Sequence, residues 1–296
     1  MKQRKWFRER LLSGQTIWSA GAYDALSAKL IEAAGFDAML TTGFGISASH
    51  LGQPDVELYT MTENLNVVRQ ICNAVDIPVV ADCDTGYGNA INVMRTVREF
   101  EQAGVSAVIL EDQVVPKRCP AIANRVEVIP RAEAVAKIKA AVEARRDPDL
   151  VIIARTDADT EEESIARAQA YIEAGADMIQ PISKTFKDGA GLRRMKAAVS
   201  RPLSLQVLGW LEKDLSSDDL REISGMATFP LVPLMTVAIA LQQNLAALAA
   251  AKHAGNLPLP MMDHKKFADV LGFAKITELQ HRLLPEAPDF LKHAAE

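Results

Sequence analysis

Two carboxylates at the end of an apolar run are the first residues whose types and spacing could do chemistry. Asp82 and Asp84 lie in the stretch VVADCDTGYGN, residues 79–89. Side chains alternate faces along a β-strand, so both acids would point the same way if the strand continued through Cys83. Acids aimed together repel each other unless a cation lies between them. The pair indicates a cation site; the alternative is that one acid caps the next helix and the other is solvated.

Two further acids, Asp55 and Glu111, lie near the ends of neighbouring apolar runs. Carboxylates without histidine or cysteine partners suit a hard cation, so the four acids predict Mg²⁺ or Mn²⁺. Mg²⁺ keeps several waters, so not all four acids need touch it. No histidine occurs between Leu51 and Lys252, which argues against a Ser-His-Asp triad and a zinc site.

Residues that could bind an anion follow other apolar runs. Thr42, Gly43 and Phe44 would expose backbone N–H groups at a helix start or loop nest, where a carboxylate or phosphate can bind. Arg155 could close on a second anionic group with two parallel hydrogen bonds. Asp157, two residues further on, is expected to cap a helix rather than to join the site.

A cysteine beside two cations could move a proton. Cys119 directly follows Lys117 and Arg118. Neighbouring cations favour the thiolate and raise the reactivity of a thiol. The sequence leaves an incidental loop thiol as an equal alternative.

These residues need elements that bring them together, and the chain alternates strand-like with helix-like segments. Such alternation predicts a parallel sheet. Three similar stretches (33–40, 102–110 and 173–179) place a glycine just before a strand, about 70 residues apart, which is room for two βα units. Eight strands can be counted, so we expect a (β/α)₈ TIM-type barrel, in which the C-terminal ends of the strands converge on one site. The alternative, an open doubly wound sheet, lacks the GxGxxG motif.

The expected strands are 15–20, 38–42, 79–82, 107–111, 150–155, 178–181, 203–207 and 227–229. The main expected helices are 23–34, 62–75, 90–103, 131–146, 160–174, 231–254 and 263–284. Residues 1–254 would form the barrel domain, and residues 255–296 a hinge and helical extension. A helix beyond a complete barrel must bury its apolar face, on its own barrel or on a neighbouring subunit.

The bulk composition narrows the class of protein. The chain has 296 residues, 49% hydrophobic and 24% charged, which is ordinary for a globular protein. Its formal net charge of −5 argues against nucleic-acid binding. Three cysteines without a CxxC pair argue against a disulfide scaffold. Because the first residues lack a long apolar run and the helix 231–251 contains polar residues, we expect a cytoplasmic protein without a membrane span.

Several motifs then carry a family resemblance. They are AYDALSAKLIEAAGF (22–36), TTGFGISASHLGQPD (41–55), ADCDTGYGN (81–89), EDQVVPKRC (111–119), IIARTDA (152–158) and FADVLGFAKITELQ (267–280). With them the chain resembles the isocitrate lyase/phosphoenolpyruvate mutase superfamily over nearly its whole length, and its methylisocitrate lyase-like members in particular. The resemblance implies a (β/α)₈ barrel whose last helix is exchanged between subunits, usually in a homotetramer.

The resemblance also implies site roles. Mg²⁺ would be held, largely through water, by Asp82, Asp84, Glu111 and Asp55. A 2-oxo or 2-hydroxy acid would be bound by Thr42, Gly43, Phe44, Asp82, Arg155 and Gln206. Catalytic roles would fall to Cys119, Lys117 and Arg155, and the loop carrying Cys119 would close over the site as a lid.

Four positions depart from the lyases of that family. The lyase lid reads KKCGH or KRCGH, whereas Pro120 and Ala121 follow the cysteine here. Ile182 stands where the lyases have Glu, and Gln206 where they have Asn. The lost polar groups suggest a smaller or more apolar substituent at the reacting carbon.

The first hypothesis is a Mg²⁺-dependent carbon–carbon lyase acting on a 2-hydroxy or 2-oxo di- or tricarboxylate, with Cys119 as the general acid. Alternatives within the superfamily are an oxaloacetate decarboxylase and a C–P bond mutase or hydrolase. From other classes, a metal-free aldolase would form a Schiff base on Lys117 or Lys184. A non-catalytic sensor would bind a small acid without turning it over.

Overall fold

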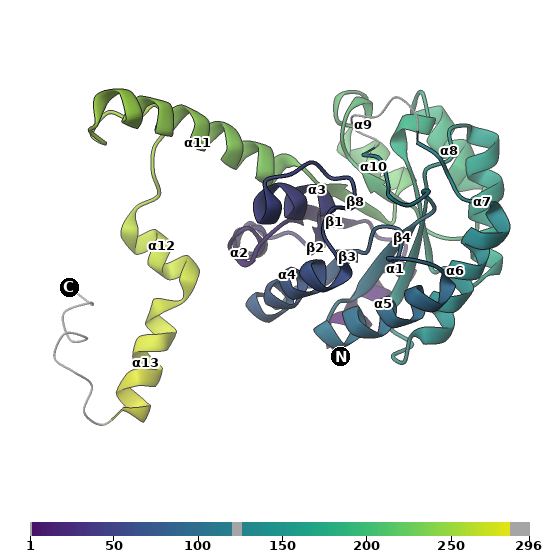
Figure 1. Cartoon of the computed structure of the whole chain (residues 1–296), viewed down its shortest axis with the longest axis horizontal. Coiled ribbons are helices and arrows are strands. Elements are labelled where there is room, and N and C mark those ends of the chain that lie inside the picture. Colours follow the sequence, from purple (N-terminus) through teal and green to yellow (C-terminus); the bar gives the residue numbers. More distant parts are fainter. Residues whose placement is uncertain (1, 120–125, 285–296) are drawn as a thin grey trace. The chain divides into compact units, whose positions relative to one another are not determined.

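The expected (β/α)₈ barrel is confirmed by a computed structural model that describes residues 2–119 and 126–284. All strand pairs are parallel, in the order β6-β5-β4-β3-β2-β1-β8-β7, and a single bridge between Ile179 and Leu203 joins β6 to β7. Helices lie around the strands (Figure 1). The strands are β1 (Ile17–Ala22), β2 (Ala38–Thr41), β3 (Val79–Asp82), β4 (Ala107–Glu111), β5 (Val151–Thr156), β6 (Met178–Pro181), β7 (Ser204–Gln206) and β8 (Met226–Phe229).

The helices between the strands follow local sequence signals. Asp24, Thr60 and Asn89 each begin a helix with reciprocal side-chain caps. The α-helices that precede β8 are α1 (Lys2–Leu12), α2 (Ala25–Ala33), α3 (Gly43–Ile46), α4 (Met61–Ala74), α5 (Ala90–Ala103), α6 (Arg131–Ala144), α7 (Glu161–Glu173), α8 (Gly189–Ala198), α9 (Trp210–Asp214) and α10 (Ser217–Ile223). The repeated glycine before β2, β4 and β6 has positive φ, as its position at a helix end requires.

The helix α1 was not predicted, and it closes the barrel at the N-terminal ends of the strands. Phe7 and Leu11 are buried in one cluster with Ile17 of β1 and Met226 of β8. Arg4 is buried too, and its Nε donates to the Val105 carbonyl at 2.7 Å. These contacts leave the opposite end of the barrel, where the strands' C-termini lie, for the site.

The loop expected between residues 43 and 59 contains helical structure. Besides α3, a π-helical turn, η1 (Ser47–Leu51), follows directly. It ends at Gly52, whose φ of +63° suits a glycine. A second short turn, the 3₁₀ segment η2 (Ser183–Thr185), follows β6.

The chain forms two compact units, residues 1–236 and 237–296. The second contains most of α11 (Val232–Ala251) together with α12 (His264–Leu271) and α13 (Phe273–Leu283). The single helix expected over 263–284 is therefore wrong, because Gly272 at φ +80° ends α12 and begins a new helix. Inside this unit, Asn244 exchanges two hydrogen bonds with the Leu259 backbone, at 3.0 and 2.9 Å.

Among the described residues, one helix, α11, is long and apolar enough to cross a membrane by length and composition. Its mean hydropathy over an 18-residue window is 1.5. Gln242, Gln243 and Asn244 lie in its second half. Polar side chains in such a position argue against a membrane span.

Candidate active site

A cavity of about 90 Å³ opens at the C-terminal ends of the strands. Seven residues predicted for the site line it: Thr42, Phe44, Asp55, Asp82, Cys119, Arg155 and Gln206. The others, Gly43, Asp84, Glu111 and Lys117, lie beside these residues and contact them, as described below. Pro120 and Ala121 are outside the described residues.

We call Asp55, Asp82, Asp84 and Glu111 the acid cluster. The strand β3 ends at Asp82, as predicted, and does not continue through Cys83 to Asp84. Instead Asp84 has a φ of +48°, and its N–H donates to Asp82 Oδ1 at 3.2 Å. A tight turn therefore brings the two acids to the same site.

The ammonium group of Lys117 lies inside the acid cluster. Its Nζ is 2.5 Å from Asp84 Oδ1, 3.0 Å from Asp55 Oδ1 and 3.8 Å from Glu111 Oε1. Burial alone would lower the pKa of Lys117, but Asp84, Glu111 and Asp55 together raise that pKa well above its ordinary value. The side chain is therefore a fixed cation and not a free amine.

Arg155 bridges two acids at the end of β5. Its Nη1 lies 2.8 Å from Glu111 Oε2 and its Nη2 lies 2.9 Å from Asp157 Oδ1. The expectation that Asp157 caps a helix is wrong, because Thr160 caps α7 by accepting from the Glu163 N–H. Asp157 instead orients the guanidinium group.

A buried hydrogen-bond network fixes the backbone of Asp157. Its N–H donates to Asp112 Oδ1 at 2.9 Å, and Asp112 Oδ2 accepts from the Tyr171 hydroxyl at 2.6 Å and from Arg167 Nη1 at 3.1 Å. Sequence reasoning missed this buried network. The only signal for it was the acid directly after Glu111 in the EDQ motif.

The short helix α3 begins at the residues that we predicted to form an anion-binding cradle. Thr42 caps it by accepting from the Gly45 N–H at 3.4 Å, and the Gly43 N–H donates to Asp82 Oδ2 at 3.3 Å. A Cβ at Gly43 would lie 2.7 Å from the Tyr59 hydroxyl and 3.1 Å from Asp82 Oδ2, so only glycine fits. The cradle and the acid cluster thus share a hydrogen bond.

Burial and mutual repulsion govern the titration of the acids. Burial, followed by the charge of Asp84, raises the pKa of Asp82 to about 6. Burial also raises the pKa of Asp55, and it raises the pKa of Glu111 well above its ordinary value despite Arg155 and Lys117. Four acids and Asp157 face only two described cations, so the site has an excess of buried negative charge.

Aromatic hydroxyls border the acid cluster and were also missed. Tyr87 donates to Asp84 Oδ2 at 3.3 Å and accepts from Asn64 Nδ2 at 2.7 Å. The Tyr59 hydroxyl is buried and, within the described structure, makes no well-formed hydrogen bond. Tyr59 lies four residues after Asp55, which is the one sequence clue to its place.

The apolar residues of the lining, which we call the apolar wall, are Leu40, Phe44, Ile109, Ile182, Leu208, Pro230 and Leu231. The lining also contains an amide pair: Gln206 Nε2 donates to Gln180 Oε1 at 3.2 Å, and the Ser204 hydroxyl donates to the same oxygen at 2.9 Å. Ile182 and Gln206 therefore face the cavity together, at the ends of β6 and β7. Among the described residues that line the cavity, Arg155 is the sole cation.

The residues fit a hard cation held in part through water. Asp55 Oδ1, Asp84 Oδ1 and Glu111 Oε2 are buried carboxylate oxygens without a hydrogen-bond partner, although Lys117 or Arg155 lies close to each. No three His, Cys, Asp or Glu side chains among the described residues are arranged to ligate one ion directly. Oxygen-only ligands suit Mg²⁺, which keeps waters.

Comparisons with known proteins identify the family of the chain. Residues 7–252 match the family described as phosphoenolpyruvate phosphomutase. The 2,3-dimethylmalate lyase of Eubacterium barkeri is 40% identical over 279 residues, 93% of this chain and 96% of the relative. The probable 2-methylisocitrate lyase 1 of Corynebacterium glutamicum is 39% identical over 271 residues, 89% of this chain and 87% of the relative.

Among solved structures, a phosphonopyruvate hydrolase in complex with oxalate and Mg²⁺ aligns with a TM-score of 0.87 at 30% identity, covering 96% of this chain and 100% of the other. The family match spans the barrel, and both lyases match over most of their own length. The chain therefore belongs to the phosphoenolpyruvate mutase/isocitrate lyase superfamily of enzymes.

Proposed function

We propose that the protein is a Mg²⁺-dependent carbon–carbon lyase that cleaves a 2-hydroxy dicarboxylate carrying small alkyl substituents, giving a 2-oxo acid and a carboxylate. One observation carries the proposal: the cavity is lined both by acids of the acid cluster with Arg155 and by the apolar wall, which includes Ile182. The acids and Arg155 suit a metal and the substrate's carboxylate end, and the apolar wall suits an alkyl group.

The metal would be held by the acid cluster, mostly through water, and Mn²⁺ would substitute for Mg²⁺. When bound, it would stabilise negative charge on the oxygen atoms of the 2-oxo acid. Its two charges would also offset the excess of buried carboxylates.

The chain's own residues would do the rest. Arg155 and the α3 cradle, Thr42 to Phe44, would hold the C1 carboxylate, and Gln206 would contact the far end of the substrate. The substrate hydroxyl would pass its proton to a carboxylate of the acid cluster and become the oxo group, while the C–C bond breaks and its electrons pass to the departing carboxylate fragment. Cys119, which lines the cavity, would protonate that fragment at carbon.

The substrate class follows from the apolar wall. Ile182 cannot pair with a third carboxylate, which favours an alkylated malate over a tricarboxylate. The 40% identical relative from Eubacterium barkeri is named for 2,3-dimethylmalate, a dicarboxylate with two methyl groups.

Decarboxylation of oxaloacetate or C–P bond chemistry is the second candidate. It is favoured by the absence of a glutamate at Ile182 and by the similarity to a phosphonopyruvate hydrolase. A Schiff base on Lys117 is disfavoured, because its buried ion pairs keep the amine protonated. Lys184 is exposed and is not among the described residues that line the cavity.

A substrate panel tests the proposal directly. Purified protein with Mg²⁺ is given 2-hydroxy and 2-oxo acids, including alkylated malates, methylisocitrate, oxaloacetate and phosphonopyruvate, and pyruvate, glyoxylate, oxalate, phosphate and CO₂ are measured. Pyruvate from an alkylated malate supports the lyase, whereas CO₂ or phosphate release supports the second candidate. Binding of oxalate without turnover of any compound would point to a sensor.

The assembly we propose is a homotetramer, built from two dimers whose subunits exchange their C-terminal helices. Support comes from large apolar side chains that the second unit leaves exposed, among them Ile239, Leu245, Phe267 and Phe273. A second copy would cover them. We expect a soluble, cytoplasmic enzyme with a small carboxylate substrate and no nucleic-acid or membrane partner.

A further inference from the structure

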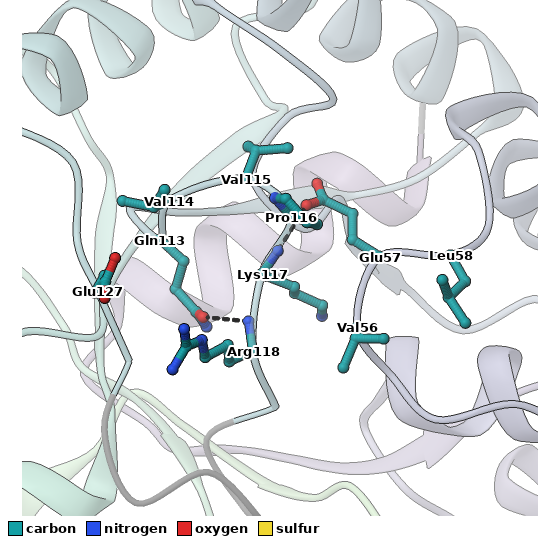
Figure 2. Close-up of a pocket in the computed structure, with 10 residues that line it drawn as sticks. All are labelled: Val56, Glu57, Leu58, Gln113, Val114, Val115, Pro116, Lys117, Arg118 and Glu127. Carbon is teal, nitrogen blue, oxygen red and sulfur yellow. Dashed lines mark hydrogen bonds between the residues drawn. The ribbon is translucent and has the colours of Figure 1, made fainter.

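One side chain from a neighbouring loop and one from its own loop hold the backbone of the Lys117 segment, which we define as Pro116–Arg118. Glu57 Oε2 accepts from the Lys117 N–H at 3.0 Å, and Gln113 Oε1 accepts from the Arg118 N–H at 3.0 Å (Figure 2). Among the described residues, the segment makes no backbone–backbone hydrogen bond. Its position therefore depends on these two acceptors and on the ion pairs of Lys117.

Glu57 connects this segment to the loops of the acid cluster. Its second oxygen, Oε1, accepts from the hydroxyl of the buried Thr85 at 2.6 Å. Thr85 directly follows Asp84, and Glu57 lies two residues after Asp55. Glu57 also has a φ of +61°, an unfavourable backbone conformation for a residue other than glycine. Such strain persists where the surroundings fix a residue for a purpose.

The segment has space beside it. A cavity of about 510 Å³ borders it, lined by Val56 to Leu58 on one side and by Gln113 to Arg118 with Glu127 on the other (Figure 2). Without its anchors, the segment could shift into this space and withdraw the Lys117 ammonium from the acid cluster.

We propose that Glu57 is a positioning residue that keeps the Lys117 ammonium in the acid cluster and so opposes binding of the divalent metal there. The inference rests on the proposed function, since it assumes the metal site. Lys117 Nζ lies 2.5 Å from Asp84 Oδ1, so a divalent cation held by the acid cluster would share these carboxylates with the ammonium group. The two cations would repel each other, so metal binding and insertion of Lys117 compete.

Loss of the Glu57 contacts should change metal binding and turnover in opposite directions. Loosening Lys117 should strengthen metal binding in the absence of substrate, while turnover falls because Lys117 is no longer delivered to the site. A residue that merely supported the fold would weaken both. The opposite changes therefore separate positioning from structural support.

The experiment measures Mn²⁺ binding by calorimetry without substrate, together with kcat and KM, for wild type, Glu57→Ala and Glu57→Gln. We expect Glu57→Ala to bind Mn²⁺ about 5-fold tighter or more, and to lose kcat. Glu57→Gln should restore both values toward wild type. Its amide oxygen can still accept from the Lys117 N–H, and its NH₂ group can donate to Thr85.

Unchanged or weaker Mn²⁺ binding by folded Glu57→Ala would overturn the inference while leaving the metal site intact. A wild type that binds no Mn²⁺ would instead overturn the proposed function, and this inference with it. If Glu57→Ala does not fold, the rate of Lys117 acylation by an amine reagent is measured in wild type with and without Mn²⁺. Faster acylation with Mn²⁺ supports the inference, and an equal rate overturns it.

Discussion

Glu111 and Arg155 are paired both in the strand register and through an ion pair of their side chains. They stand opposite each other in the β4–β5 register, and Arg155 Nη1 lies 2.8 Å from Glu111 Oε2. Since the strand ladder fixes both Cα positions, the backbone sets the geometry of the ion pair before a substrate arrives. The guanidinium group that we assign to the substrate is thus preorganised by the sheet itself.

Replacing Arg155 by Met should destabilise the protein by about 3 kcal/mol, because Glu111 and Asp157 would be left buried without their cation. Unfolding in urea measures the loss. The matched control is Arg193→Met on the surface, where Arg193 pairs with Asp219 and Glu222; this change should leave the free energy of unfolding nearly unchanged, because solvent screens exposed ion pairs. Equal costs for the two variants would show that the Arg155 pair is no more important to stability than a surface one.

Replacing Cys119 by Ser should reduce kcat by about 100-fold or more, because a hydroxyl is a far weaker acid than a thiol. Substrate binding should change little. Cys72→Ser is the control: Cys72 does not line the cavity, and burial raises the pKa of its thiol to about 12. Near-full activity in Cys119→Ser would contradict the lyase assignment and favour decarboxylation or C–P chemistry.

Asp84→Ala should abolish turnover, because this acid contacts Lys117 and belongs to the proposed metal site. In wild type, EDTA should abolish turnover and added Mg²⁺ should restore it, whereas Mg²⁺ should not restore the variant. Activity that survives EDTA, together with an enzyme–substrate adduct that borohydride traps, would instead identify a Schiff-base aldolase.

Ile182→Glu should shift substrate preference. A carboxylate in the apolar wall would disfavour the alkyl group, so kcat/KM for an alkylated malate should fall at least about 10-fold relative to methylisocitrate. Leu208→Met, which preserves an apolar side chain in the same cavity, should leave the ratio nearly unchanged. An unchanged ratio in Ile182→Glu would mean that this wall does not select the substituent.

The metal-free protein should show a pH dependence that comes from Asp82. Burial and Asp84 raise the pKa of Asp82 from 3.8 to about 6, so the folded protein keeps a proton that the unfolded chain has lost between these values. The contribution of Asp82 to stability is therefore greatest near pH 4 and is lost as the pH rises through 6. Relative to Asp82→Asn, wild type in EDTA should lose on the order of 2 kcal/mol across this window. Parallel unfolding curves for the two proteins would contradict this titration.

Local sequence patterns were enough to predict the strands that carry the site. The run before Asp82 and the run before Glu111 have the bounds that the structure gives to β3 and β4. In a parallel barrel, this alone brings the acids to one end. The positive φ of Asp84 was not predictable, because it depends on how the turn packs against neighbouring loops.

The contacts of Lys117 and the helix α1 were missed for related reasons. Lys117 reaches Asp55 across 62 residues of sequence, and no local pattern encodes such a contact. The first residues, KQRKWFRER, are strongly basic and show no clear apolar face. Their burial of Phe7 and Leu11 becomes favourable only when a barrel end is present to receive them.

The single bridge between β6 and β7 has a consequence for how such an enzyme can change its substrate over evolution. Most strands that carry the acid cluster and Arg155 are tied into continuous ladders, whereas the bridge between Ile179 and Leu203 is the one backbone pairing described between the two strands whose ends bear Ile182 and Gln206. Substitutions at this seam disturb few backbone hydrogen bonds. Selectivity for the substituent can therefore diversify there while the charged half of the site stays the same.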